Sequence, residues 1–546
     1  MTNARSCLNR RQFLRLTGLT LAGGSLTQLV VACAPTGSPA ATTAPATGGA
    51  PAPTSVAGSP ASPTQAAPAV ARRAGSATIS VVQAADVPNL DPSRNLFIHV
   101  FNVADNVLDT PSYLDRNLKV QPRLATSWNA KDNTTWEVIF RSGVKFHDGT
   151  PFDTSAVKAS FDYQTASDAG SRSFFGNWDS LSVVDATTVR VKTKAPEPYF
   201  PNTLSRLWVF SPADLKDRSV FGTRMNGTGP FKLTEFTQGQ QITVAANGEY
   251  WGGAPKIDTV VFRAAPEASA RTAMLQAGQA DIVVNLPVEQ AKQIDASDQL
   301  RVAAVVGLRG VPLMIDQRTG PPLTDLRVRQ AMNYAVDKDA IIKNVLGGYA
   351  QQQPATISPL IEGHNQDVTP YVYDPDKAKQ LLSDAGYANG FDIDFHHPSG
   401  RWMKDAESAQ AIAQMLGKVG IKANLMTAEY SSFFTSWSKG DYRGMTMIGV
   451  TNPDGAPNSL FNLFLYSKGS WPYSWTDPKM DSLIEKARST MDSTARVNTY
   501  HELEQYVHDN AAWLFLWEQK DLYGINKALK WEPSSNEIMH FWDASR

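Results

Sequence analysis

Cysteine is almost absent from this chain. Only Cys7 and Cys33 occur among 546 residues, and both precede Ala34. No disulfide framework, zinc cluster, iron–sulfur site or cysteine nucleophile can therefore form in the main body. We predict a protein without a metal or another cofactor.

A concentrated charge of one sign is also missing. Lys and Arg total 51, Asp and Glu total 52, and the formal net charge is -1. A nucleic-acid-binding protein normally carries a basic patch or stripe, so this class of partner is excluded. Hydrophobic residues at 42% and charged residues at 19% indicate a globular protein.

Catalytic patterns are lacking as well. No G-x-S-x-G elbow occurs, and in Phe146-His147-Asp148-Gly149 the Asp-Gly pair indicates a turn rather than an acid–base pair. His501-Glu502-Leu503-Glu504-Gln505 has glutamine where the zinc motif HExxH needs its second histidine. We interpret it as a solvated helix face and predict no catalytic residue and no enzyme activity.

The first apolar run is too short to cross a bilayer. It extends from Leu16 to Val31 and follows Arg10-Arg11 and Phe13, a pattern that resembles a twin-arginine export signal. Val30-Val31-Ala32-Cys33 resembles a bacterial lipobox, which implies acylation of Cys33. The alternatives are an amphipathic helix or short anchor, and a cysteine that ends the signal by chance.

A segment of low complexity follows this signal. Residues 34–75 are almost wholly Ala, Pro, Thr, Ser and Gly, which bury too little apolar surface to offset the entropy of ordering. We predict a flexible tether of a few nanometres. Such a tether suits a surface receptor, and it also suits an exported hydrolase.

Strand and helix patterns alternate from Ser76 onward, which predicts a mixed α/β body. Trp136, Val138 and Phe140 share one face of a predicted strand, with Glu137 and Ile139 on the other. Asp374-Pro375 and Asp477-Pro478 supply an N-cap followed by proline in the first turn of a helix. Further patterns predict strands at 78–81, 189–191, 391–395 and 445–450, and helices at 325–335 and 339–346.

Several segments in order resemble the family 5 extracellular solute-binding proteins of ABC importers. They are Asn89-Leu90-Asp91-Pro92-Ser93, Pro122 to Trp128, Arg141 to Phe152, Gly227-Thr228-Gly229-Pro230-Phe231, Asn247 to Gly253, Asp325 to Ala331, and Tyr373 to Ala378. The resemblance implies a two-lobed, periplasmic-binding-protein-like clamshell (class II, cluster C) with an extra subdomain in the first lobe. The implied division is 1–32 signal peptide, 33–75 tether, 76–111, 225–305 and 520–546 lobe I, 112–224 extra subdomain, and 306–519 lobe II.

The resemblance also directs attention to three regions where a solute would bind. Arg401 and Trp402 follow a predicted strand in a loop, and Asn452 and Asp454 follow another. In peptide-binding relatives an aspartate near the second loop pairs with the peptide ammonium, but Asp454 departs from the usual spacing. The third region contributes aromatic side chains, namely Tyr430 and Phe433, with Trp475 as a cover of the pocket.

These features predict the substrate-binding component of an ABC importer. It would capture a small solute, most simply a di- or oligopeptide, and deliver it to a permease and ATPase complex. An oligosaccharide or a metal chelate is the alternative solute, and a chemosensory or chaperone-like receptor is the alternative class. We expect a monomer, lipid-anchored at Cys33 on the extracytoplasmic side of the membrane.

Overall fold

The computed structural model describes residues 77–546 except 453, 470, 472–474 and 476. The predicted export signal with Arg10 and Arg11, the lipid anchor Cys33 and the tether therefore lie outside the described residues. Within the described part of the chain, no helix is long and apolar enough to span a bilayer.

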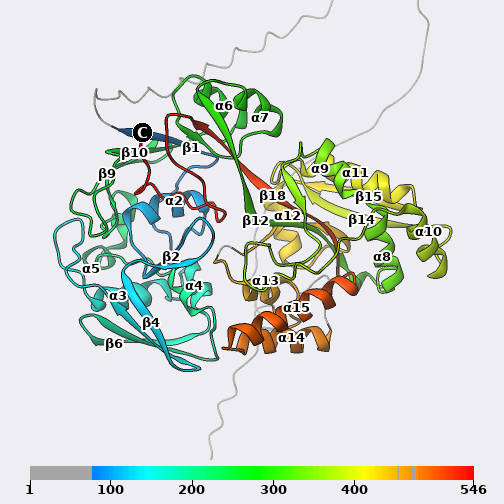
Figure 1. Ribbon diagram of the computed structural model, residues 1–546, viewed down its shortest axis with the longest axis horizontal. Helices are drawn as coiled ribbons and strands as arrows, with labels where there is room; N and C mark the ends of the chain where they lie inside the picture. The colour runs from blue at the N-terminus through cyan, green and yellow to red at the C-terminus, as the bar shows by residue number, and fades with distance from the viewer. Residues whose placement is uncertain (1–76, 453, 470, 472–474, 476) are drawn as a thin grey trace, which may run out of the picture. The chain divides into compact units, whose positions relative to one another are not determined.

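A mixed sheet of twelve strands organises the body (Figure 1). Its order is β15-β14-β16-β12-β18-β11-β1-β10-β9-β8, with β13 beside β18 and β17 beside β12. The strands are β1 Thr78–Gln83, β8 Phe231–Thr237, β9 Gln241–Ala246, β10 Thr259–Ala264, β11 Ile282–Val283, β12 Leu300–Asp316, β13 Ala350–Gln352, β14 Phe391–Pro398, β15 Ile421–Ala428, β16 Gly444–Met447, β17 Val450–Thr451 and β18 Trp513–Asn526.

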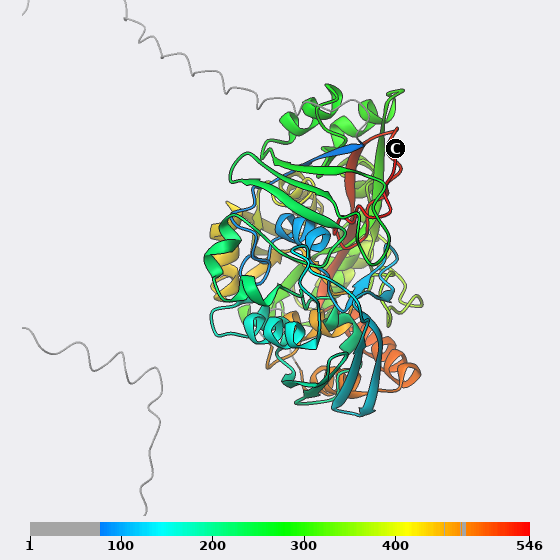
Figure 2. The same ribbon diagram turned by 90° about the vertical axis from the view of Figure 1, so that its left-hand side faces the viewer.

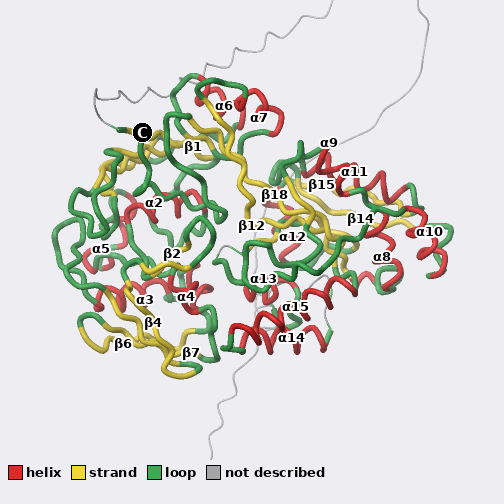
Figure 3. The backbone as a smooth tube through the Cα atoms, viewed as in Figure 1, coloured by secondary structure: helices red, strands yellow, loops and turns green. Residues whose placement is uncertain are grey.

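Strands β12 and β18 are the two long strands that join the halves of the sheet (Figures 1 and 3). We call the elements around β8, β9, β10, β1 and β11 lobe I, and those around β16, β14 and β15 lobe II. The residue boundaries predicted for the lobes stay a prediction. The pairing of β12 with β18 shifts register between Val306 and Gly310, where residues 307–309 bulge out opposite Gln519. We call residues 307–309 of β12, the facing residues 518–521 of β18 and the side chains that pack on them the hinge.

Helices cover both lobes and bury separate apolar cores. Lobe I carries α2 Ile98–Val107, α6 Ala268–Gln276 and α7 Val288–Asp295. Lobe II carries α8 Leu326–Ala335, α9 Lys338–Asn344, α10 Pro375–Asp384, α11 Asp405–Gly417, α12 Tyr430–Ser438, α13 Pro457–Phe464, α14 Pro478–Ser489 and α15 Ser493–Asp509, with the short turn η3 Gln317–Thr319.

A four-stranded antiparallel sheet forms the extra subdomain (Figure 2). Its aromatic core packs Trp136, Phe161, Trp178 and Phe200 against one another. The chain between α2 and β8 contains β2 Ser112–Leu114, β3 Val120–Pro122, β4 Ala125–Asp132, β5 Thr135–Phe140, α3 Thr154–Gln164, η1 Gly170–Phe175, β6 Trp178–Asp185, β7 Thr188–Thr193, α4 Phe200–Leu204, α5 Pro212–Leu215 and η2 Arg218–Gly222.

The carboxylate of Asp109 explains why several of the sequence motifs lie where they do. Asp109 is 0% exposed and pairs with Arg123, with 2.5 Å between Oδ1 and Nε. Thr228 Oγ1 and Trp251 Nε1 donate to its Oδ2 at 2.9 Å, and Tyr250 Oη donates to Oδ1 at 3.2 Å. Three motifs that are distant in the sequence therefore converge on one buried anion.

The predicted helix starts are confirmed by their capping bonds. Asp374 accepts from the N–H of Lys377, and Asp477 accepts from the N–H of Met480. Gly386 follows α10 with φ of 90°, as expected for a glycine that ends a helix. The helix expected from Asp339 instead begins at Lys338, with Asp337 as its N-cap.

Two other expectations about turns and strands have different outcomes. The turn at His147-Asp148-Gly149 is confirmed, because Asp148 Oδ1 accepts from the N–H of Thr150 and Gly149 has φ of 88°. The single strand expected at 445–450 is wrong. It forms β16 and β17, which are separated at Gly449, where the indole of Trp402 packs closely against the backbone.

The sequence predicted a solvated helix face at residues 501–505, and this prediction is wrong for Glu504 of α15. This residue is 0% exposed, and its carboxylate accepts from the N–H groups of Ile357 and Asn365, both at 2.6 Å, and from Thr356 Oγ1. Burial raises the pKa of Glu504 to about 8, although these hydrogen bonds oppose the shift. A loop that folds over the helix creates this burial, and the helical pattern alone does not reveal it.

Candidate functional site

The hinge brings together charged side chains from distant parts of the chain. Arg309, in the bulge of β12, pairs with Glu537 of the C-terminal segment at 2.7 Å. Asp521 of β18 lies against Gly307, where an added Cβ would be 2.4 Å from Asp521 Oδ2. Glycine at position 307 therefore leaves room for this carboxylate.

Burial controls the ionisation of these groups. It raises the pKa of Asp521 well above its usual range, the charge of Glu537 adds to the shift, and Arg309 opposes it. Burial also raises the pKa of Glu518 to about 7. Burial disfavours the charged form of Arg309, but the carboxylates of Glu537 and Asp521 outweigh that effect and raise its pKa.

An aromatic wall from lobe II lies beside these charges. The ring centroid of Trp402 is 5.9 Å from that of Tyr430, and the guanidinium of Arg401 lies 5.1 Å from the Tyr430 centroid. Asp405 holds the loop by accepting from the N–H groups of Arg401 and Trp402 at 2.8 and 3.1 Å. Tyr430 also acts electrostatically on Arg309, and Arg401 acts on Asp521, so the wall and the hinge charges are neighbours.

The loop between β17 and α13 lies at a contact between lobe II and the extra subdomain. Asn202 Nδ2 donates to the backbone oxygen of Asp454 at 2.9 Å. The Asp454 carboxylate accepts from the N–H of Ala456 at 3.3 Å and from Ser459 Oγ at 3.1 Å. Burial raises the pKa of Asp454, and the positive charge of Arg206 opposes the shift.

The structure thus brings some of the predicted site residues together and separates others. Arg401, Trp402 and Tyr430 form one group at the hinge. Asn452 is 2% exposed and donates to the oxygen of Ala456, which holds its own loop. Phe433 is 0% exposed and lies beneath Trp402, with 6.4 Å between centroids.

Trp475 packs at the edge of the apolar cluster that contains Trp402 and Phe433. Its ring contacts Tyr506 of α15, with 5.7 Å between centroids. None of the structural contacts tests whether these residues bind a solute, so their role stays a prediction.

Sequence reasoning missed Arg309, Asp521 and Glu537. Of these three, only Asp521 has a signal in the sequence, because the polar run Glu518-Gln519-Lys520-Asp521 lies inside an otherwise apolar strand. No comparable signal marks Glu537, because its place is set by the path of the C-terminal segment.

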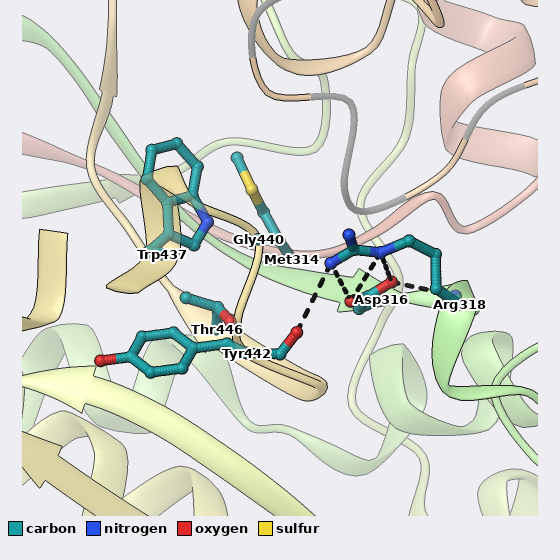
Figure 4. Close-up of a pocket in the computed structure, with 7 residues that line it drawn as sticks. All are labelled: Met314, Asp316, Arg318, Trp437, Gly440, Tyr442 and Thr446. Carbon is teal, nitrogen blue, oxygen red and sulfur yellow. Dashed lines mark hydrogen bonds and ion pairs between the residues drawn. The ribbon is translucent and has the colours of Figure 1, made fainter. Parts of the chain in front are cut away.

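Two hollows elsewhere on the body contrast with this site. The first, at the end of β12, is only about 10 Å³, too small for a solute, and Arg318 closes it by pairing with Asp316 (Figure 4). The second, about 630 Å³, lies between α7, α9 and α11 and is lined by Val288, Glu289, Lys292, Lys343, Asn344, Val345, Gly347, Tyr349, Lys404 and Glu407. Among the described residues, no group of three His, Cys, Asp or Glu side chains could hold a metal ion.

Two lobes joined by paired strands, with polar and aromatic side chains between them, define a binding protein that encloses a solute. The profile of the bacterial extracellular solute-binding proteins, family 5, matches residues 119–471. The chain belongs to this family.

Individual relatives agree with this assignment. The chain is 30% identical over 452 residues to the dipeptide-binding protein of Escherichia coli, covering 76% of this chain and 83% of that protein. It is 28% identical to the glutathione-binding protein GsiB of Pectobacterium atrosepticum, with the same coverage. In fold it is similar to DppA from Helicobacter pylori in complex with peptide STSA, with a TM-score of 0.72, 23% identity and coverage of 86% and 97%.

Proposed function

We propose that this chain is the extracytoplasmic receptor of an ABC importer and that it captures a small peptide between its lobes for delivery to the permease. The observation that carries the proposal is the convergence of charged and aromatic side chains from both lobes at the hinge. Arg309 and Asp521 would orient a polar solute, and Trp402 and Tyr430 would bury its apolar parts. The names of the relatives, which bind a dipeptide, glutathione and a peptide, support the choice of a peptide.

A binding screen tests the proposal directly. The full chain would be titrated by calorimetry with di- to pentapeptides, maltotriose and a nickel–histidine chelate. We expect a saturable signal from at least one peptide. Binding of the saccharide or the chelate without any peptide would replace the proposed solute class, and binding of unfolded polypeptide alone would favour a chaperone-like receptor.

Lobe closure is expected to depend on Asn202. Replacing Asn202 with Ala removes the hydrogen bond to Asp454 across the lobes, and a solute that binds by closure loses the free energy of that bond. We expect the Kd of any bound peptide to rise roughly fivefold, since one neutral hydrogen bond contributes about 1 kcal/mol. Calorimetry measures this change.

Ser205→Ala in the same region provides the matched control. Ser205 Oγ donates to the backbone oxygen of Asn202, a contact within its own segment. Its loss should leave the Kd unchanged. Equal effects of the two substitutions would mean that the contact between Asn202 and Asp454 does not contribute to closure.

Anchoring at Cys33 is part of the same proposal. Acyl chains on one cysteine would hold the receptor at the membrane, because two chains suffice for stable anchoring. Cys33→Ser should abolish incorporation of radiolabelled palmitate and shift the chain from the membrane fraction to the soluble fraction. Cys7→Ser should retain both properties, and continued labelling of the Cys33 variant would exclude Cys33 as the anchor.

A further inference from the structure

The hinge contains a carboxylate that the protein itself leaves uncompensated. In the described part of the chain, the carboxylate of Asp521 makes no hydrogen bond or ion pair; its Oδ2 is enclosed against Gly307, and its Oδ1 is the oxygen that is not enclosed. The residue as a whole is partly exposed. Burying a charged oxygen without a partner costs free energy of folding, so the presence of an aspartate at position 521 requires an explanation.

The charges around Asp521 are unbalanced. Three carboxylates, those of Glu518, Asp521 and Glu537, face two guanidinium groups, those of Arg309 and Arg401. Arg309 is already paired with Glu537 at 2.7 Å. Arg401 is exposed and lies over the ring of Tyr430 rather than in contact with Asp521. The cluster therefore has one more acidic group than basic groups, and an ionised Asp521 has no cation of the protein paired with it.

The position of Asp521 makes it available to a solute between the lobes. Its neighbour on the same face of β18, Tyr523, packs in the core of lobe I, whereas Leu308 of the bulge packs in the core of lobe II with Trp402. Asp521 thus lies where the two cores meet. A second unsatisfied group occurs in the adjacent wall, because Trp402 is 7% exposed and its Nε1 has no hydrogen-bond partner within the described residues.

We propose that Asp521 is the counter-ion for a positively charged group, an ammonium or a guanidinium, of the bound solute. The inference rests on the proposed function and adds the charge of the solute to it. Charge-assisted hydrogen bonds are strong where water is excluded.

Asp454 is the rival for this role, and its surroundings differ. Its carboxylate already accepts from Ala456 and Ser459, and the charge of Arg206 lies near it. An added cation at Asp454 would meet a carboxylate already engaged within its own loop. Asp521 has no such partners.

The ionisation of Asp521 gives a pH dependence with a defined sign. Burial and the charge of Glu537 raise its pKa, whereas Arg309 and Arg401 oppose the shift and Glu518 adds to it. A cation binds the ionised carboxylate, so binding to the protonated form must release a proton. Affinity for a permanently charged guanidinium should therefore rise as the pH rises through the pKa of Asp521.

Matched probes test the charge requirement on the unmodified full chain. Trialanine, N-acetyl-trialanine, agmatine and maltotriose would be titrated by calorimetry. We expect trialanine or agmatine to bind, and we expect acetylation of trialanine to abolish binding or weaken it at least roughly tenfold. If only neutral probes bind, or if no cationic probe binds, the inference is overturned.

Variants then assign the charge to a residue. Asp521→Asn should weaken the cationic probe roughly 10- to 100-fold and remove the rise of affinity with pH. The same substitution should raise the Tm of the ligand-free protein, because it removes an unpaired carboxylate, whereas a merely structural residue would lower the Tm. Asp376→Asn, at a carboxylate of α10 that is 94% exposed, is the control and should leave the affinity unchanged.

The outcomes separate this inference from the proposed function. Binding of agmatine without any peptide would contradict the peptide proposal and support the role of Asp521. Peptide binding that depends on Asp454 and not on Asp521 would support the proposed function and overturn the inference.

Discussion

Replacing Asp109 with Asn is expected to lower the free energy of unfolding by about 3–5 kcal/mol. The substitution keeps the shape of the side chain but leaves the guanidinium of Arg123, 3% exposed, without its charged partner. It also weakens the hydrogen bonds from Thr228 and Trp251 that hold two loops against α2. Urea unfolding monitored by tryptophan fluorescence measures the change.

Asp543→Asn is the control for the loss of one aspartate charge. Asp543 pairs with Arg116 at 2.7 Å, but both side chains are nearly half exposed. Solvent screens such a pair, so the control should change stability by less than about 1 kcal/mol. If both substitutions changed the free energy of unfolding equally, the buried pair of Asp109 and Arg123 would stabilise the protein no more than an exposed ion pair does.

Replacing Gly227 with Ala is expected to destabilise the protein by about 3 kcal/mol, since overpacking against backbone cannot relax by a change of rotamer. An added Cβ would lie 2.1 Å from the backbone oxygen of Val107 and 2.9 Å from the Cα of Leu108. The C-terminal end of α2 would have to move away from the segment that enters β8. The same unfolding measurement applies, and the m-value should remain unchanged.

Gly248 provides the matched control within the next motif. A Cβ added at Gly248 has no other atom within 4 Å. Gly248→Ala should therefore change the free energy of unfolding by no more than about 0.5 kcal/mol. A large loss at Gly248, or none at Gly227, would show that close packing does not explain the glycines of these motifs.

Local rules made much of the fold predictable. Asp374 and Asp477 cap helices because a short carboxylate accepts from the first free N–H groups, and a following proline suits the first turn. The alternation at Trp136, Val138 and Phe140 predicted β5 because it repeats every two residues. The contacts of Thr228 and Trp251 with Asp109 could not be predicted, because contacts between residues more than a hundred positions apart produce no periodic pattern in the sequence.

The candidate site was predictable only in part. The loop with Arg401 and Trp402 follows a predicted strand, and the structure brings it together with Tyr430 at the start of α12. Asp521 lies within a strand whose burial depends on a bulge in its neighbour, so its environment is a property of the paired strands. The burial of Glu504 likewise depends on a distant loop, which no helical pattern encodes.

The distance of a contact from the hinge determines how far it travels if the lobes rotate about β12 and β18. Asp521 lies within β18, one of the two strands that join the lobes, so its lever arm is short. The contact between Asn202 and Asp454 involves lobe II and the extra subdomain, and its lever arm is longer. If Asp521 holds the solute charge as proposed, we expect it to do so while the lobes are still apart, and we expect the outer contact to affect mainly the dissociation rate of the solute.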